Sequence, residues 1–216
     1  MLFIGYYKYL FKPKPGSLSD LLDRFSRSIG NGFTVIQVGA NDGITHDPIH
    51  KFIKRDRWTG VLLEPQKDVF EQKLSKLYRK HPEINAINCA LGDEDGSTNI
   101  YKIGFSTARW ATGLASFNRA HLLEAFESGH VIKQAAKEGI TIPEDTAKYI
   151  VAEKVKVLCP ETILSKYNLS KIDMLQIDAE GFDFEVVKLF KIDKTNPKLV
   201  CFESSHLSKE EYAECH

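Results

Sequence analysis

The sequence GANDG, at positions 39–43, directly follows an apolar run with the composition of a buried strand. Gly39 would let the backbone turn tightly and let a ligand approach it closely. Asn41 belongs to the residue type that, after glycine, best tolerates a left-handed conformation. Gly43 would allow close packing where the next helix begins. A turn of this kind at the carboxyl end of a strand is typical of α/β proteins that bind nucleotide-like ligands.

A carboxylate lies at the end of the next predicted strand. Glu64 follows the turn by about 20 residues, the spacing at which a carboxylate accepts hydrogen bonds from both hydroxyls of a ribose. The dinucleotide pattern is GxGxxG, whereas this chain has GxNxG, which argues against a pyrophosphate at the helix start. The layout therefore predicts a nucleoside-containing ligand without choosing among nucleosides.

Four further ionisable side chains follow predicted strands later in the chain: Asp178, Glu180, Glu203 and His206. A carboxylate or a histidine at such a place can take up a proton. Asp178, Glu203 and His206 could instead hold Mg²⁺ in an oxygen-rich site. The alternatives are that Glu180 is only a first-turn acid favoured by a helix dipole, and that His206 is a surface histidine. Loop or solvated helix positions are expected for His46, His50, Asp183 and Glu185.

Strands alternate with helices along most of the chain, which predicts an open α/β sheet with mostly parallel strands. Short apolar runs predict strands at residues 33–38, 60–63, 84–88, 97–103, 154–158, 174–177 and 199–202. Caps and helical periodicity predict helices that start at Ser19 or Asp20, at Asp47-Pro48 and at Pro143, and others at 70–78, 122–126, 161–167 and 182–190. Ligands bind such sheets outside the carboxyl ends of the strands, where the strand order reverses.

Residues 104–155 interrupt this alternation. An insertion of about 50 residues is too long for a plain connection, so we expect a helical cap over the carboxyl ends of the strands. The alternative is an insertion that packs elsewhere. The segment carries Arg109, Trp110, Thr112 and Ser116, and such a mixture suits a sugar ring among many other ligands.

The composition is that of a globular protein, with 43% hydrophobic and 27% charged residues. A chain of 216 residues favours one domain, which we place at residues 17–216, after an apolar and basic segment at 1–16. That segment is expected to be a helix packed on the domain or on a partner. The alternative is a peripheral membrane contact aided by Lys8, Lys12 and Lys14. No run reaches 18 apolar residues, so we expect no membrane-spanning helix.

Charge and cysteine content limit the partners and the compartment. The chain has 29 basic and 29 acidic residues, so it lacks a global field that would attract nucleic acid. Its four cysteines are widely spaced and form no CxxC pair, which indicates neither a disulfide framework nor a zinc site. A reducing cytoplasm fits this pattern best.

Four segments, in this order, resemble the FkbM-type family of S-adenosylmethionine-dependent methyltransferases: VIQVGANDG, VLLEP, INCALGDEDGS and MLQIDAEGFDFEVV. The resemblance covers about residues 33–206. It implies the seven-stranded methyltransferase variant of the Rossmann sheet, and O-methylation of a saccharide or a related metabolite. Two alternatives are a nicotinamide-dependent oxidoreductase, against which the absent GxGxxG argues, and a non-catalytic S-adenosylmethionine-binding protein of the same fold.

The resemblance also implies roles for single residues. The cofactor site would comprise Gln37, Gly39, Ala40, Asn41, Gly43, Glu64, Pro65, Asn88, Cys89, Ala90 and Asp178. Within it, Glu64 would hold the ribose hydroxyls and residues 88–90 would border the adenine. Because an alcohol is a poor nucleophile, methyl transfer needs a base, and the candidates are Asp178, Glu180 and His206.

Two features depart from the family. An acid usually stands at the position of Gln37, so we expect Gln37→Glu to tighten cofactor binding, since a charged acceptor is stronger than a neutral one. The sequence also ends soon after the fifth predicted strand of the sheet. The last two strands of the family's sheet are therefore expected to be absent, which would leave an edge open to pairing with another copy. The alternative is that the sequence is a fragment.

Overall fold

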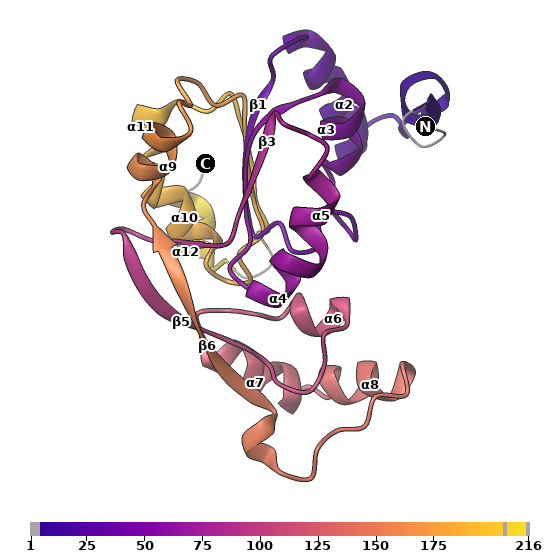
Figure 1. The fold of residues 1–216 in the computed structure, drawn as a ribbon, viewed down its shortest axis with the longest axis vertical. Helices are drawn as coiled ribbons and strands as arrows, with labels where there is room; N and C mark the ends of the chain where they lie inside the picture. Colours follow the sequence, from indigo (N-terminus) through magenta and orange to yellow (C-terminus); the bar gives the residue numbers. More distant parts are fainter. Residues whose placement is uncertain (1–4, 205–206, 215–216) are drawn as a thin grey trace.

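A computed structural model describes residues 5–204 and 207–214 of the chain (Figure 1). Five parallel strands form the main sheet in the order β3-β2-β1-β7-β8. Their bounds are Thr34–Val38 for β1, Thr59–Leu63 for β2, Ile84–Ile87 for β3, Met174–Ile177 for β7 and Leu199–Cys201 for β8. The strand order reverses between β1 and β7, as in a Rossmann sheet. The predicted α/β class and the open parallel sheet are confirmed.

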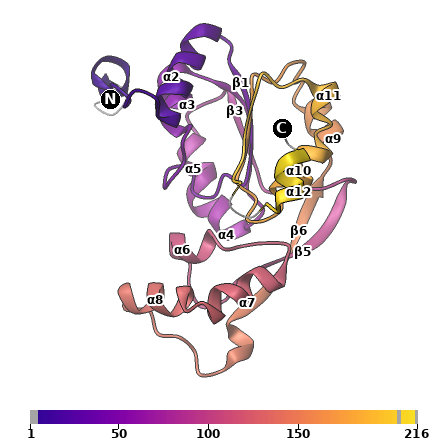
Figure 2. The same cartoon turned by 180° about the vertical axis from the view of Figure 1, so that it is seen from behind.

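Helices cover both faces of this sheet (Figures 1 and 2). One face carries α2 (Leu18–Ile29), α3 (His50–Asp56) and a continuous helical segment made of α4 (Lys67–Val69), η2 (Phe70–Leu74) and α5 (Ser75–Tyr78). The other face carries α9 (Pro160–Lys166), α10 (Asp183–Leu189) and α11 (Ile192–Thr195). The last described helix is α12 (Lys209–Glu214).

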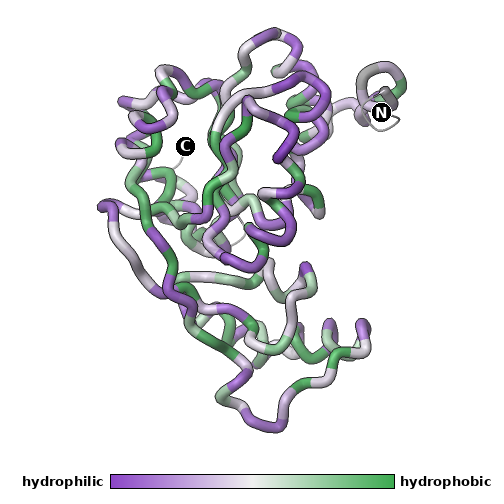
Figure 3. The backbone as a smooth tube through the Cα atoms, viewed as in Figure 1, coloured by the Kyte–Doolittle hydropathy of each residue, from purple (hydrophilic) through white to green (hydrophobic). Residues whose placement is uncertain are grey.

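The middle strand β1 is buried along its whole length. Val35 belongs to the core on the α2 and α3 face, whereas Ile36 and Val38 belong to the core on the α10 face. This alternation follows from the two-residue period of a strand, and burial on both faces explains why the run is almost entirely apolar. In Figure 3 the hydrophobic colours run along the strands of the main sheet.

The segment between β3 and β7 forms a second, smaller sheet and the cap. The strand β6 (Ile150–Leu158) pairs antiparallel with β5 (Gly96–Ile103) and parallel with the short β4 (Ala90–Leu91). Between β5 and β6 lie α6 (Arg109–Thr112), α7 (Arg119–Glu127), α8 (His130–Lys137) and the turn η3 (Thr146–Lys148). An isolated bridge between Tyr101 and Ser116 divides this stretch into an inner part, 104–117, and an outer part, 118–149.

Some local expectations were wrong. The Ser17 hydroxyl accepts from the backbone N–H of Asp20 and caps α2, so the cap precedes the two residues we expected. No helix starts at Pro143. Instead a helix that the sequence analysis did not identify, α8, precedes this position and buries Val131 and Ala135.

The N-terminal segment lies against α3 of the domain. Phe11 packs against the core on the α2 and α3 face, and the Lys51 ammonium lies 4.9 Å from the centre of its ring. In η1 (Tyr6–Leu10), Tyr9 is 75% exposed and Leu10 is 69% exposed. A membrane contact there stays a prediction.

Two further findings concern the extent of the chain. Across the described residues, no helix is both long enough and apolar enough to cross a membrane. Within 5–204 and 207–214, β8 is the last strand, and it pairs with β7 alone.

Candidate functional site

A cavity lies where the carboxyl ends of the main strands meet the cap. Its empty volume is about 600 Å³, part of it open to solvent. The sheet side contributes Val38, Gly39, Leu63, Glu64, Cys89 and Asp178, among others. The cap side contributes Arg109, Thr112, Gly113, Ser116 and Phe117. The cavity thus occupies the reversal of strand order between β1 and β7.

The turn after β1 passes against the end of β7. Gly39 has φ +78°, and a Cβ added there would lie 1.8 Å from the carbonyl oxygen of Asp178, so the position admits no side chain. Asn41 adopts φ +45°, the left-handed conformation expected from its residue type. Its backbone N–H donates to Glu64 Oε2 over 2.8 Å, which ties the turn to the end of β2.

Glu64 is a buried wall residue of the cavity, only 2% exposed. Its Oε1 accepts from the backbone N–H and the side-chain amide of Gln66, at 2.8 and 3.2 Å. Its Oε2 accepts from Asn41 N–H. Burial nevertheless raises the pKa of Glu64 to about 7. A carboxylate offers about four acceptor positions, so Oε2 can still accept from a ligand hydroxyl.

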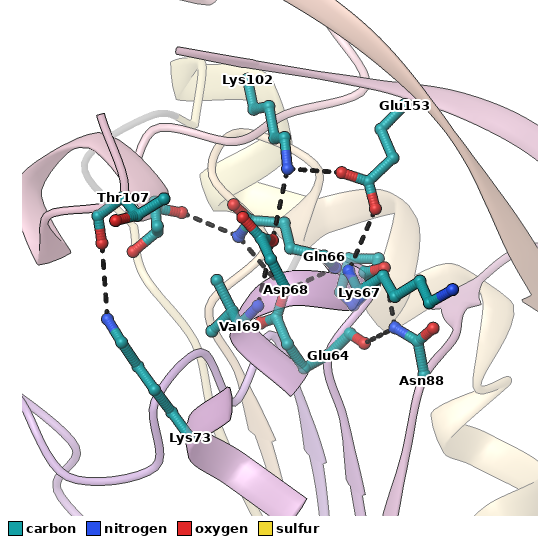
Figure 4. Close-up of polar contacts among 12 residues, drawn as sticks. Glu64, Gln66, Lys67, Asp68, Val69, Lys73, Asn88, Lys102, Thr107 and Glu153 are labelled. Atoms are coloured by element: carbon teal, nitrogen blue, oxygen red, sulfur yellow. Dashed lines mark hydrogen bonds and ion pairs between the residues drawn. The ribbon is translucent and has the colours of Figure 1, made fainter. Parts of the chain in front are cut away.

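The predicted cofactor residues at positions 65 and 88–90 divide into two groups. Cys89, Ala90 and Pro65 line the cavity. Asn88 instead holds the end of β2, because its amide nitrogen donates to the carbonyls of Glu64 and Pro65 over 2.9 Å each (Figure 4). Burial raises the pKa of the Cys89 thiol to about 12, so this residue is a neutral apolar wall at physiological pH.

Three residues that the resemblance assigned to the cofactor lie behind the cavity wall. The amide nitrogen of Gln37 donates to Asp47 Oδ2 over 3.1 Å, on the α3 face of the sheet. Ala40 belongs to the core on that same face. At Gly43, an added Cβ would lie 2.8 Å from Leu74, so this glycine permits close packing against the α4–α5 segment.

Acidic residues gather at the ends of β7 and β8. Glu180 lines the cavity with a left-handed backbone at φ +47°. Burial, together with the charges of Asp178 and Glu203, raises its pKa to about 8. Asp183 is not solvated as we expected, because it accepts from the backbone N–H groups of Ala179 and Glu203 at 3.3 Å each. Burial raises its pKa to about 6.

Two other expectations concern histidines. His50 is buried and contacts the Tyr78 hydroxyl at 3.1 Å, and burial lowers its pKa to about 4, so the solvated position was wrong. His206 lies outside the described residues. Within the described ranges, no group of three or more His, Cys, Asp or Glu side chains is arranged to hold a metal ion.

Comparison with known families decides the relationship. The sequence model for the methyltransferase FkbM domain matches residues 37–215, most of the chain and all of the cavity lining. The chain belongs to the FkbM methyltransferase family. No curated protein and no solved structure gave a significant match. The resemblance found in the sequence is thereby confirmed, and the oxidoreductase alternative has no support.

In this FkbM methyltransferase the cap is bonded directly to the turn after β1 and to the residues that follow β2. The carbonyl of Thr112, in α6, accepts from the side-chain amides of Asn41 and Gln66, at 3.1 and 2.9 Å. Asn41 also bonds Glu64, through its backbone N–H, and Gln66 does so through the same side-chain amide. Gln66 was not identified as a site residue from the sequence, although its position two residues after Glu64 could have indicated it.

A second connection joins the hairpin of β5 and β6 to α4, which follows β2. The Lys102 ammonium lies 2.5 Å from Glu153 Oε2 and 3.2 Å from Asp68 Oδ1 (Figure 4). These charges raise the pKa of Lys102 against the opposing effect of burial. These ion pairs link β5 and β6 to α4. The two strands from which the cap extends are therefore held beside the cavity.

The methyltransferase cap also contacts Glu180. Ser116 Oγ donates to the Glu180 carbonyl over 2.9 Å, and His121 Nε2 lies 3.9 Å from Glu180 Oε2. The sequence did not single out His121, because its approach to Glu180 depends on how α7 packs over the sheet.

Proposed function

We propose that this methyltransferase uses S-adenosylmethionine and methylates a hydroxyl of a saccharide or related metabolite. One observation carries the proposal: a single cavity joins a ribose-type carboxylate, Glu64, to a half-buried carboxyl, Glu180, on its far strand end. The first residue suits a nucleoside, and the second suits proton transfer from an alcohol.

The residues present fit S-adenosylmethionine. The cavity is lined by three acids, Glu64, Asp178 and Glu180, which complement a ligand that carries a cationic amine and a sulfonium. Gly39 keeps the turn free of a side chain where the ligand would lie. When bound, this cofactor supplies an electrophilic methyl group.

The chain's own residues would then position the acceptor and take its proton. Glu180 is the favoured base, because a carboxyl with a pKa of about 8 is partly ionised near neutral pH and is basic enough to accept from a polarised hydroxyl. His121 lies beside it and can support the proton transfer. A base of this type contributes typically 10²–10⁴-fold, and alignment by the cap supplies the rest.

A neighbouring hollow supports a saccharide acceptor. It shares Leu91, Phe117 and Phe182 with the cavity, so a bound chain can extend from one into the other. Its other lining groups combine an aromatic ring with hydroxyl, amide and acidic side chains: Asp93, Glu94, Asp95, Ser97, Thr98, Asn99 and Tyr101. Aromatic faces and hydrogen-bonding groups together suit a hydroxylated ring.

We also propose a reducing compartment such as the cytoplasm. The three cysteines in the described residues, Cys89, Cys159 and Cys201, are free thiols. Unpaired cysteines of this kind are usual where thiols are kept reduced.

Calorimetric titration with S-adenosylhomocysteine and NAD tests the cofactor, and we expect binding of the first alone. The acceptor is tested with S-adenosylmethionine carrying a labelled methyl group and a panel of saccharides, phenols and carboxylic acids. We expect label on a saccharide that survives alkali, because a methyl ether is stable where a methyl ester hydrolyses. Binding without transfer to any acceptor would favour the non-catalytic alternative, and binding of NAD alone would overturn the cofactor assignment.

A further inference from the structure

Arg109, the first residue of α6, is the only cation among the described residues that line the cavity. Its Nε is buried and has no hydrogen-bond partner in the described part of the chain. A buried donor left without a partner costs free energy, so the arrangement points to an acceptor that a ligand brings. The other charged residues of the lining are acids, so a ligand group that accepts hydrogen bonds would be bound by Arg109 and not by them.

The guanidinium has a defined place over the cavity floor. A Cβ added at Gly113, another lining residue, would lie 2.2 Å from Arg109 Nη1, so this glycine makes room for the guanidinium. The charge of Arg109 acts on Glu64, on Asp42 in the turn after β1, and on Glu180. Arg109 is therefore near enough to Glu64, to the turn and to Glu180 for its charge to act on them.

The segment that carries Arg109 is fixed at both ends. The Lys73 ammonium donates to the carbonyl of Thr107 over 3.5 Å (Figure 4). At the other end, the Thr112 carbonyl accepts from Asn41 and Gln66. These contacts hold the backbone that carries Arg109 beside the cavity, which lowers the entropic cost of ordering this segment on binding.

We infer that Arg109 binds the carboxylate of the methionine moiety of S-adenosylmethionine, so that the cap is part of the donor site. The inference rests on the proposed function. With the ribose at Glu64, the methionine chain must run past the turn toward Glu180, which is the space that Arg109 borders. That chain carries one carboxylate, which the acids of the lining repel and a guanidinium can bind through two parallel hydrogen bonds.

The test compares two ligands that differ only in that carboxylate: S-adenosylhomocysteine and its decarboxylated analogue. We expect Arg109→Met to weaken binding of the first by roughly 10- to 150-fold, the range for a hydrogen bond to a charged group, and of the analogue by less than twofold. Arg109→Lys should retain part of the discrimination, because lysine keeps the charge without the fork. The matched control is Arg119→Ala, an exposed arginine of α7 outside the cavity lining.

Each other outcome has a distinct meaning. Equal loss for both ligands would show that Arg109 only shapes the cavity, and would overturn the inference. Unchanged affinity for both would overturn it too, and a raised KM for the acceptor in that case would assign Arg109 to an anionic acceptor. Failure of the wild-type protein to bind either ligand would refute the proposed function itself. A thermal melt of each variant separates these results from misfolding.

Discussion

The raised pKa of Glu64 makes ribose binding depend on pH. The ionised carboxylate keeps an acceptor position on Oε2 for a ribose hydroxyl, whereas the protonated acid carries an O–H donor and has fewer acceptor positions. Binding therefore selects the ionised form, and the apparent affinity should rise with pH through the pKa of about 7. At pH 6 about nine-tenths of the free protein is protonated at Glu64, and at pH 8 about one-tenth. The dissociation constant should thus fall by about tenfold between these two values.

The suitable ligand is 5′-methylthioadenosine, because it keeps the ribose but has neither the amine nor the carboxylate of the full cofactor. Calorimetry at pH 6 and pH 8, in buffers with different ionisation enthalpies, gives both the affinity and the number of protons released. We expect close to one proton released per ligand at pH 6. Glu64→Gln keeps an acceptor oxygen for the Gln66 N–H and cannot titrate, so its affinity should lose this pH dependence. The control is Glu138→Gln, an exposed acid at the end of α8.

The same carboxyl predicts a trend in stability. The unfolded chain loses the Glu64 proton near pH 4.5 and the folded chain only near pH 7, so the folded state binds more protons between these values. Stability due to this group is therefore full below pH 4.5 and falls as pH rises to 7, by roughly 3 kcal/mol. In denaturant unfolding, the free energy of unfolding of Glu64→Gln should depend less on pH than that of the wild-type protein.

The binding experiment can refute the ribose assignment. It would do so if the affinity for 5′-methylthioadenosine were equal at pH 6 and pH 8, or if a tenfold change persisted in Glu64→Gln.

Three other substitutions test the site. Gly39→Ala should destabilise the fold by about 1–3 kcal/mol in denaturant titration, because the new methyl meets the Asp178 carbonyl and the φ is positive; an unchanged midpoint would contradict the close packing there. Gln37→Glu should lower stability more at pH 8 than at pH 5 without tightening the cofactor, the reverse of the expectation from the family, because it adds a second carboxylate beside buried Asp47. Glu180→Gln should lower kcat at least a hundredfold and change the affinity for S-adenosylhomocysteine less than twofold. The wild-type rate should rise with pH up to about 8, since the base acts when ionised, and a pH-independent rate would exclude Glu180.

The parts of the site that follow from local chemistry could be predicted from the sequence. Gly39 and Asn41 have the left-handed backbone that their residue types allow, and Glu64 stands at the carboxyl end of β2 in the cavity wall. The strand β7 has the bounds predicted for it. In each case a short apolar run predicts the strand, and the end of that strand predicts where the residue lies.

The parts that depend on packing could not be predicted. Gln37 is one residue before the cavity, but the strand period directs it toward Asp47 on the other face. Asp183 looks like an ordinary first-turn acid, yet the loop after β8 brings a second N–H to it. His121 reaches Glu180 only because α7 folds back across the sheet. No local pattern encodes these three contacts.

The bridge between Tyr101 and Ser116 divides the cap into two parts, and the sequences of these parts are constrained by different contacts. The inner part, 104–117, carries Thr112, which bonds Asn41 of the turn and Gln66 beside Glu64, so its length and sequence are tied to these contacts. The outer part, 118–149, leaves and returns at neighbouring points of the hairpin, because Ile103 pairs with Ile150. Residues 118–149 line neither the cavity nor the neighbouring hollow, so changes there leave the contacts of the turn intact, apart from the approach of His121 to Glu180. We therefore expect the rest of the site to tolerate exchange of α7 and α8 between relatives.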